Sequence, residues 1–186
     1  MSAHYVHPTA VIDDNVTIGD GTKIWHFCHV LGNSHIGENC VLGQNVMAGP
    51  DVYIGNGCKV QNNVSLYKGV KLENDVFCGP SCVFTNVLTP RAFVERKDQF
   101  QETLVCIGAS IGANATIICG IMIGAYALIG AGAIVTKDVP AHALILGNPG
   151  RQHGWVSREG EVLDSTLKCP RTGDAYILTD AGLVLS

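Results

Sequence analysis

The chain contains little charge and has no long basic segment. Asp, Glu, Lys and Arg together make up 15% of its 186 residues, the net charge is −4, and the longest basic run is Arg96-Lys97. A nucleic-acid-binding surface needs a dense cluster of cations. The composition therefore argues against nucleic acid as a partner.

The chain also lacks the segments that direct a protein to a membrane. Its first residues, Met1-Ser2-Ala3-His4, contain no charged stretch followed by an apolar one, so they do not resemble a signal peptide. Residues 107–136 carry no charge and are long enough to cross a bilayer. Their glycines, however, recur with a six-residue period, which is typical of short solenoid strands. We expect a cytoplasmic protein with no membrane insertion.

A cysteine pattern typical of a zinc site is missing too, although the chain has eight cysteines. Cys169 begins the sequence Cys-Pro-Arg-Thr-Gly, which resembles half of a zinc knuckle, but no Cys-x-x-Cys pair accompanies it. A structural zinc site needs four ligands. Most of the other cysteines fall at positions that suit a small core residue. We predict free thiols, a reducing compartment and no metal.

What the chain does contain is a repeat of six residues. Aliphatic or small side chains occupy every sixth position, and Gly, Asn and Asp, which tolerate positive φ, cluster between them. Such a period fits neither an amphipathic helix nor an alternating strand, and predicts a solenoid of short strands joined by tight corners. The positions are Val6, Ile12, Ile18, Ile24, Val30, Ile36, Leu42, Ala48, Ile54, Val60, Leu66, Leu72, Cys78, Phe84, Val105, Ile111, Ile117, Ile123, Ile129 and Val135. With three strands per coil, they predict an all-β fold of six to seven coils in which residues 18 apart are stacked.

One segment interrupts the repeat. Between Phe84 and Val105 the register slips by three, so an insertion, residues 86–104, leaves one corner while the coils continue beyond it. A long loop in an otherwise regular solenoid is usually functional. We therefore divide the chain into a β-helix domain, residues 1–150, and a C-terminal extension, residues 151–186. Two apolar runs around a Thr-Asp-Ala-Gly turn predict a β-hairpin within the extension.

Polar side chains form a column when residues 18 apart are compared. His26, Gln44 and Asn62 make this column, and Trp25 lies beside His26. An indole next to an imidazole suits the face of a base or a sugar, so the column could be a wall that binds a hydrophilic ligand. The alternative is that its corner side chains satisfy backbone groups.

Several motifs identify the family that the chain resembles. Taken together, they are similar to the hexapeptide-repeat N-acetyltransferases, whose fold is a left-handed parallel β-helix with three faces. Among these, the chain looks most like the bacterial enzymes that acetylate the 3-amino group of UDP-2-acetamido-3-amino-2,3-dideoxyglucuronate for lipopolysaccharide. The motifs are QNNVSLY at 61–67, DVFCGPS at 75–81, FTNV at 84–87, PR at 90–91, ERK at 95–97, VP at 139–140, GNP at 147–149 and GWVSR at 154–158.

The resemblance implies acetyl-CoA as co-substrate, a homotrimer with active sites between neighbouring prisms, and contact of Asn86 with the reacting amine. Acetyl transfer from a thioester needs a neutral, oriented amine, a donor for the oxyanion and exclusion of water. No histidine lies between His35 and His142. We therefore favour positioning of the amine by Asn86, with the departing sulfur collecting the proton. The alternative is a general base, for which His26 is the first candidate and His29 and His35 are the others.

The two substrates also need binding residues. The uronate carboxylate and the diphosphate require cations, and acetyl-CoA requires room for its pantetheine arm and cations for its phosphates. At Ala109 and Ala127, small side chains would expose the backbone to pantetheine, or else simply pack tightly. For the sugar nucleotide we assign Tyr67, Lys68, Arg91, Arg96 and Lys97, with Glu95 as a competing ion-pair partner. For the phosphates of the coenzyme we assign Lys137 and Arg151.

Other functions remain open at this stage. A γ-type carbonic anhydrase shares the fold but needs three zinc-binding histidines from different coils, whereas His26, His29 and His35 fall within one coil. A non-catalytic scaffold would bind no acetyl-CoA. Within the acyltransferases, a 4-amino sugar or a simpler amine is the main rival substrate.

Overall fold

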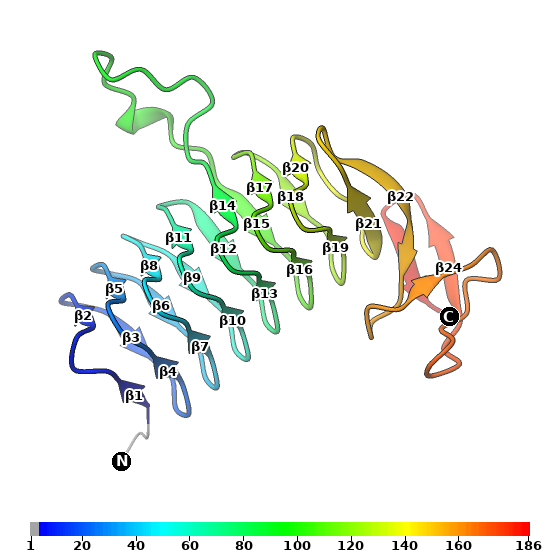
Figure 1. Ribbon diagram of the computed structural model, residues 1–186, viewed down its shortest axis with the longest axis horizontal. Coiled ribbons are helices and arrows are strands. Elements are labelled where there is room, and N and C mark those ends of the chain that lie inside the picture. The colour runs from blue at the N-terminus through cyan, green and yellow to red at the C-terminus, as the bar shows by residue number, and fades with distance from the viewer. Residues whose placement is uncertain (1–3) are drawn as a thin grey trace.

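The structure is a computed structural model that describes residues 4–186. Residues 1–3, which belong to the segment used above to argue against a signal peptide, lie outside the described part. The described chain winds into a triangular prism of stacked coils, with the insertion projecting from its side and a small C-terminal extension at one end (Figure 1). No helix within residues 4–186 is long and apolar enough to cross a membrane.

Three parallel sheets form the sides of the prism. The first contains β1 (Tyr5–Val6), β4 (Lys23–Ile24), β7 (Val41–Leu42), β10 (Lys59–Val60), β13 (Phe77–Cys78), β16 (Ser110–Ile111), β19 (Leu128–Ile129) and β21 (Ala143–Leu146). The second contains β2 (Val11–Ile12), β5 (His29–Val30), β8 (Met47–Ala48), β11 (Ser65–Leu66), β14 (Val83–Phe84), β17 (Thr116–Ile117) and β20 (Ile134–Val135). The third contains β3 (Thr17–Ile18), β6 (His35–Ile36), β9 (Tyr53–Ile54), β12 (Val70–Leu72), β15 (Thr103–Val105) and β18 (Met122–Ile123).

The predicted β-helix is therefore confirmed, and it is slightly longer than the repeat alone indicated. Val139 bridges Ile123 and so closes the seventh coil, and β21 begins an eighth. Neither belongs to the uninterrupted six-residue series, which is why the sequence predicted six to seven coils. The arrangement is consistent with the left-handed coil of the family.

The register explains the repeat. Neighbouring strands pair with partners 18 positions apart, as Lys23 does with Val41, so every sixth side chain points into the same narrow core. Ile24, Leu42 and Val60 are all fully buried. Corner residues take left-handed backbone conformations, for example Asn45 with φ of 59° and Asn63 with φ of 62°. We call the corner between the first and second sheets the first corner, and the next two the second and third corners.

The core cysteines do more than fill space. They are buried as expected, but three of them also donate a hydrogen bond to the carbonyl of a residue at the next coil's corner. The pairs are Cys28 to Gly43 at 2.9 Å, Cys40 to Gly55 at 3.0 Å, and Cys58 to Glu73 at 3.0 Å. The hydroxyl of Thr22 makes the same contact with Gly37 at 2.7 Å. These donors satisfy carbonyl groups that the strand ladders leave unpaired.

The insertion leaves the second corner of the fifth coil. Leu72 pairs with Val105, 33 positions on, instead of the 18 that separate Ile54 from Leu72, so 15 residues are added to this coil. The segment between β14 and β15 contains one short 3-10 helix, η1 (Lys97–Gln99), and projects away from the prism (Figure 1). The side chain of Phe93 is 87% exposed. The insertion therefore contributes little to the core of its own chain.

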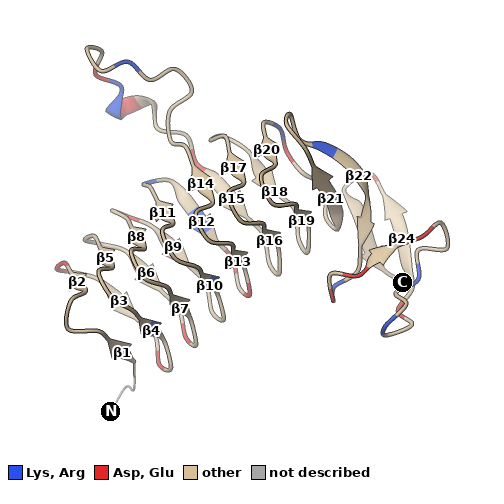
Figure 2. Cartoon of the chain, viewed as in Figure 1, with Lys and Arg blue, Asp and Glu red and all other residues tan. Residues whose placement is uncertain are grey.

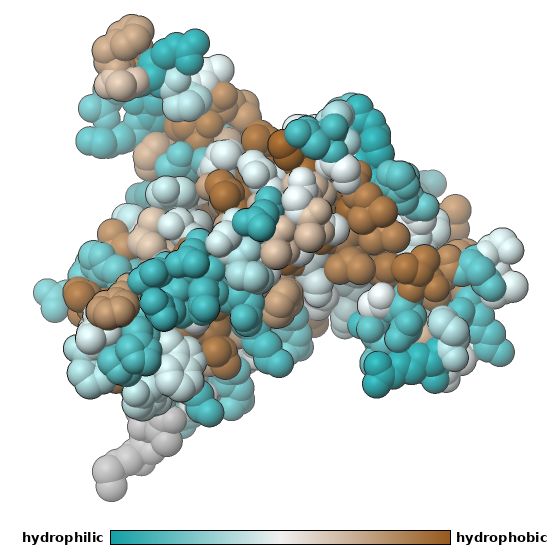
Figure 3. Space-filling view, in the orientation of Figure 1, coloured by the Kyte–Doolittle hydropathy of each residue, from teal (hydrophilic) through white to brown (hydrophobic). Residues whose placement is uncertain are grey.

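The extension continues the first sheet and then forms a second small core. β22 (Arg151–Val156) pairs antiparallel with β21 and with β23 (Val162–Leu163), and β24 (Tyr176–Thr179) pairs with β25 (Gly182–Leu185) in a hairpin. Leu163, Cys169, Tyr176 and Leu183 pack together beneath it. Charged residues are sparse on the coils and more frequent on the insertion and the extension (Figure 2). Between coils and extension the visible surface is apolar (Figure 3).

Candidate active site

Asn86 lies at the root of the insertion, on a backbone that the coils hold in place. Its carbonyl accepts a hydrogen bond from the N–H of Gln101 at 3.0 Å, which closes the base of the loop. Beside it, the hydroxyl of Thr85 accepts from the N–H of Cys119 at 2.9 Å. The Asn86 side chain is half-buried, and within residues 4–186 its amide has no hydrogen-bond partner. A fixed amide with free bonding capacity suits the orientation of a substrate group.

The cations assigned to the sugar nucleotide lie at or near this corner but engage neighbouring groups. Lys68, next to the exposed Tyr67, contacts Asp51 at 2.8 Å, and this hydrogen bond lowers the pKa of the Asp51 carboxyl. On the insertion, the other three have partners within the loop. Arg91 donates to the carbonyl of Pro90, Arg96 donates to Gln99, and Lys97 contacts Glu95 at 3.3 Å. These exposed contacts are weak enough to be exchanged for a ligand.

A separate hollow lies at the first corner of the second to fourth coils. Trp25, His26, Gln44 and Asn62 line it together with Val41, Gly43 and Gln61, and its volume is about 300 Å³. The Asn62 side-chain oxygen accepts from the N–H of Gln44 at 2.9 Å, so part of the column does satisfy backbone groups. The structure therefore brings the four predicted residues together, with one side-chain oxygen already engaged.

The three histidines proposed as alternative bases do not meet. His26 stacks on His7 with 3.5 Å between ring centroids, and burial together with the charge of His26 lowers the pKa of His7. His29 lies on the second sheet and contacts Asp13 at 3.0 Å. His35 lies on the third sheet. Within the described residues no three His, Cys, Asp or Glu side chains are close enough to hold a metal ion.

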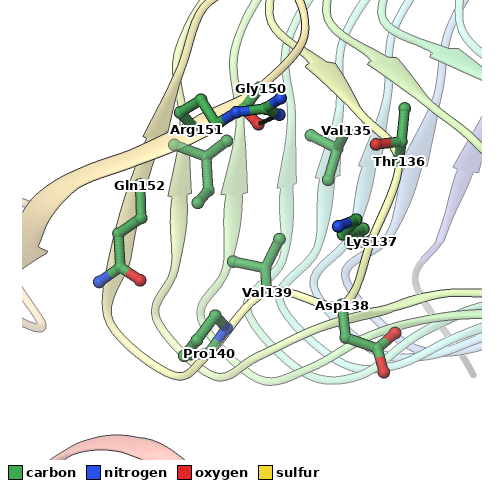
Figure 4. A pocket seen from close by; sticks show the side chains of 10 residues that line it. Val135, Thr136, Lys137, Asp138, Val139, Pro140, Gly150, Arg151 and Gln152 are labelled. Carbon is green, nitrogen blue, oxygen red and sulfur yellow. Dashed lines mark hydrogen bonds between the residues drawn. The ribbon is translucent and has the colours of Figure 1, made fainter.

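Lys137 and Arg151 lie together at the end of the prism. With Val135, Thr136, Gly150 and other neighbours they line a hollow of about 310 Å³ (Figure 4). Lys137 belongs to the second corner, the same prism edge as Asn86, two coils further on. At ~4.8 Å per coil this is a separation of about 10 Å along the axis. The assigned phosphate-binding cations therefore lie in line with the assigned amide.

The expectation for Ala109 and Ala127 is wrong. Both are fully buried, because their side chains point into the core rather than toward a ligand. Their backbone groups are also paired: Ala109 accepts from Phe77, and Ala127 accepts from Ser110. Tight packing, the alternative considered above, explains both residues.

Sequence reasoning missed an apolar hollow next to the one that Lys137 and Arg151 line. It has a volume of about 360 Å³ and shares Asp138, Val139 and Pro140 with that neighbour. Met122 supplies one wall, and Ala181, from the hairpin turn of the extension, supplies another. The hairpin reaches this place because the N–H of Ala141 donates to the carbonyl of Ala181 at 3.1 Å. No local sequence signal gives such a long-range contact.

Comparisons with known proteins agree with this architecture. Residues 15–50 and 33–68 match the family described as bacterial transferase hexapeptide (six repeats), and residues 108–137 match the hexapeptide repeat of succinyl-transferase. The dTDP-3-amino-3,6-dideoxy-alpha-D-galactopyranose 3-N-acetyltransferase of Aneurinibacillus thermoaerophilus is 44% identical over 179 residues, 95% of this chain and 92% of that protein. The chain therefore belongs to the hexapeptide-repeat family of acetyltransferases.

Two solved structures share the fold. PerB from Caulobacter crescentus, in complex with CoA and GDP-perosamine, matches with a TM-score of 0.52 and 23% identity over 82% of this chain; the match spans only 58% of the PerB chain. A hexapeptide-repeat acetyltransferase from Vibrio cholerae, complexed with acetyl coenzyme A, matches with a TM-score of 0.52 and 24% identity over 62% of this chain and 70% of the other.

Proposed function

We propose that this protein transfers the acetyl group of acetyl-CoA to the amino group of a nucleotide-linked 3-amino sugar. The observation that carries the proposal is the position of Asn86. Its amide, which has no hydrogen-bond partner among residues 4–186, lies at the root of the insertion, on the prism edge that also ends at Lys137 and Arg151. The near full-length similarity to an enzyme with this kind of substrate supports the choice of reaction.

The chemistry demands little beyond positioning. The amine nitrogen attacks the thioester carbonyl, the C–S bond breaks, and the departing thiolate takes the proton that the nitrogen loses. The side-chain oxygen of Asn86 would accept a hydrogen bond from the neutral amine and so direct its lone pair toward the carbonyl. The stacking of His26 on His7 weakens its case as general base, because the imidazole is already engaged with another ring.

The coenzyme would lie along the second corner. Its phosphates would contact Lys137 and Arg151, which line a common hollow. Phosphates prefer such paired cations, and arginine can bind them through two N–H groups. The adjoining apolar hollow beside Met122 offers room for an uncharged part of the molecule.

The site also requires more than one copy of the chain. The hollow at Trp25 and His26 lies on the first corner, whereas Asn86 lies on the second, so one chain cannot bring them to one ligand. A cyclic homotrimer, in which the first corner of one copy faces the second corner of the next, would join them. The exposed Phe93 of the projecting insertion would then contact the neighbouring copy.

Two nucleotide sugars are the main candidates. A dTDP-linked 3-amino-6-deoxyhexose is supported by the relative at 44% identity. A UDP-linked 3-amino uronate, a precursor of lipopolysaccharide, is supported by the cations Arg91, Arg96 and Lys97, since a uronate carboxylate needs such a partner. We place the reaction in the cytoplasm, because all eight cysteines are free thiols.

The test is a thiol-release assay with acetyl-CoA and a panel of nucleotide-linked amino sugars, including a 4-amino sugar. Asn86→Ala should keep the fold and the oligomeric state and lower kcat at least ~100-fold, the scale expected for loss of transition-state positioning. Asn63→Ala, at a regular corner, is the matched control and should keep kcat. Near-normal turnover by Asn86→Ala would refute the role of Asn86. If none of the amino sugars in the panel causes thiol release, the proposed function is refuted.

A further inference from the structure

Phe27 occupies a backbone position that its side chain disfavours. Its φ is 57°, in the left-handed region where a bulky residue is a genuine outlier. At the equivalent position of the third to seventh coils, small or polar residues take this left-handed conformation. They are Asn45, Asn63, Ser81, Asn114 and Gly132, whereas Thr9 of the first coil does not take it. The second coil therefore replaces a small or polar corner residue with a phenyl ring, at a cost in stability.

Within residues 4–186, the Phe27 ring gains little packing that would compensate for this strain. The Phe27 side chain is 59% exposed and does not belong to the core. Tyr126 provides the contrast, because it has the same conformation, with φ of 57°, at a third corner. Its ring stacks on His142 at 5.1 Å and lies beneath the guanidinium of Arg158 at 5.0 Å. The ring of Tyr126 is packed between two neighbours, whereas that of Phe27 is mostly exposed.

The Phe27 ring lies next to His26, one of the residues that line the first-corner hollow. Its centroid is 6.1 Å from that of His26, and the ring of Trp25 lies nearly parallel to that of His26, with 6° between planes. Of the seven described residues that line the hollow, none carries a fixed charge, whereas Gln44, Gln61 and Asn62 offer amide donors and acceptors. Such a site suits a neutral planar group with hydrogen-bonding edges, and does not suit a diphosphate.

We propose that the first corner of the second coil, with Phe27 as its stacking platform, binds the nucleobase of the sugar nucleotide. This inference rests on the proposed function for the identity of the ligand. The hollow spans the second to fourth coils and Asn86 belongs to the fifth, so they are offset along the axis by about 5–15 Å. A nucleoside diphosphate sugar can cover that offset between adjacent copies, with its diphosphate near Lys68.

Phe27→Asn is the decisive variant, because it installs the residue that the next two coils use. It should raise the melting temperature, since the strain is relieved, and raise the KM for the sugar nucleotide about 5–150-fold, the range expected when one base-stacking ring is lost. The KM for acetyl-CoA and the oligomeric state should not change. Phe27→Tyr should keep the wild-type KM. Ser81→Asn places the same residue in the same column without removing a ring, and should leave all kinetic constants unchanged.

A KM for Phe27→Asn within twofold of wild type would overturn the inference. The inference would also be overturned if Phe27→Asn dissociated the assembly and Phe27→Leu restored it. An aliphatic side chain can fill an interface between copies, but it offers no flat face on which a base could stack. Calorimetry with UDP, dTDP and GDP separates this inference from the proposed function. Suppose that one of these nucleotides binds, that Phe27→Asn weakens its binding, and that the protein transfers no acetyl group. This result would refute only the proposed function. Active enzyme with unchanged KM in the variant would refute only the inference.

Discussion

The thiol of Cys40 provides a direct test of how the core is held together. It is fully buried, and its sulfur donates to the carbonyl of Gly55 at 3.0 Å. Cys40→Ala removes this hydrogen bond, which contributes about 0.5–1.5 kcal/mol. It also removes a buried atom comparable to a CH₂ group, which contributes about 0.8 kcal/mol. We expect the free energy of unfolding to fall by about 1–2.5 kcal/mol, or the melting temperature by about 2–10 °C.

Cys40→Ser should be less harmful than Cys40→Ala, although serine is the more polar residue. Its hydroxyl can donate to the same carbonyl, as the hydroxyl of Thr22 does one coil earlier. Cys119 is the matched control, because it is buried but, within residues 4–186, its thiol donates to no carbonyl. At Cys119, the serine variant should therefore be less stable than the alanine variant, since a buried hydroxyl without a partner costs about 1–3 kcal/mol. Thermal unfolding in reducing buffer measures all four variants. If serine is worse than alanine at both positions, the cysteines are merely small apolar residues.

Three further predictions concern the sites and the extension. Lys137→Ala and Arg151→Ala should each raise the KM for acetyl-CoA several-fold with kcat little changed, and an unchanged KM would contradict their role. Lys68→Met should lower kcat/KM for the sugar nucleotide, and a normal kcat/KM would exclude contact of Lys68 with the substrate. The melting temperature should shift by less than about 4 °C, because an exposed pair such as Lys68–Asp51 contributes at most about 1 kcal/mol. Burial lowers the pKa of His142, so the unfolded chain binds its proton at a higher pH than the folded one. Stability should therefore fall as the pH drops below about 6.5, and His142→Asn should make the melting temperature less dependent on pH between 7.5 and 5.

The regular part of the fold could be predicted from the sequence because one rule repeats in every coil. Each coil has the same inward-facing positions, so the six-residue spacing alone predicts that Ile24 and Leu42 are buried. The same arithmetic correctly grouped Trp25, His26, Gln44 and Asn62 around one hollow. It also located the insertion.

The rest depended on information that the repeat does not contain. Ala109 faces the core because it occupies an inward position of its coil. Its small size alone suggested contact with a ligand, which was the wrong answer. The contact of Ala141 with Ala181 joins the coils to the extension through tertiary packing that has no local signal. The backbone conformation of Phe27 follows from its corner position, and only comparison with Asn45 and Asn63 makes it conspicuous.

Departures from the repeat indicate where function can reside in such a fold. A regular corner places Asn, Asp or Gly in the left-handed conformation and pairs its backbone with the adjacent coil, which leaves little for a ligand to change. Apart from the packed rings of Tyr126 and His142, the chain departs from this pattern at two corners. At the second corner of the fifth coil, closing a longer loop costs entropy, and at the first corner of the second coil, Phe27 is strained. Among the described residues, Phe27 and Phe93 both lie outside the core and have side chains that are mostly exposed. Because both departures lower the stability of the single chain, a ligand or a neighbouring copy is the consistent reason for them, and they lie on the two corners that a cyclic assembly would bring face to face.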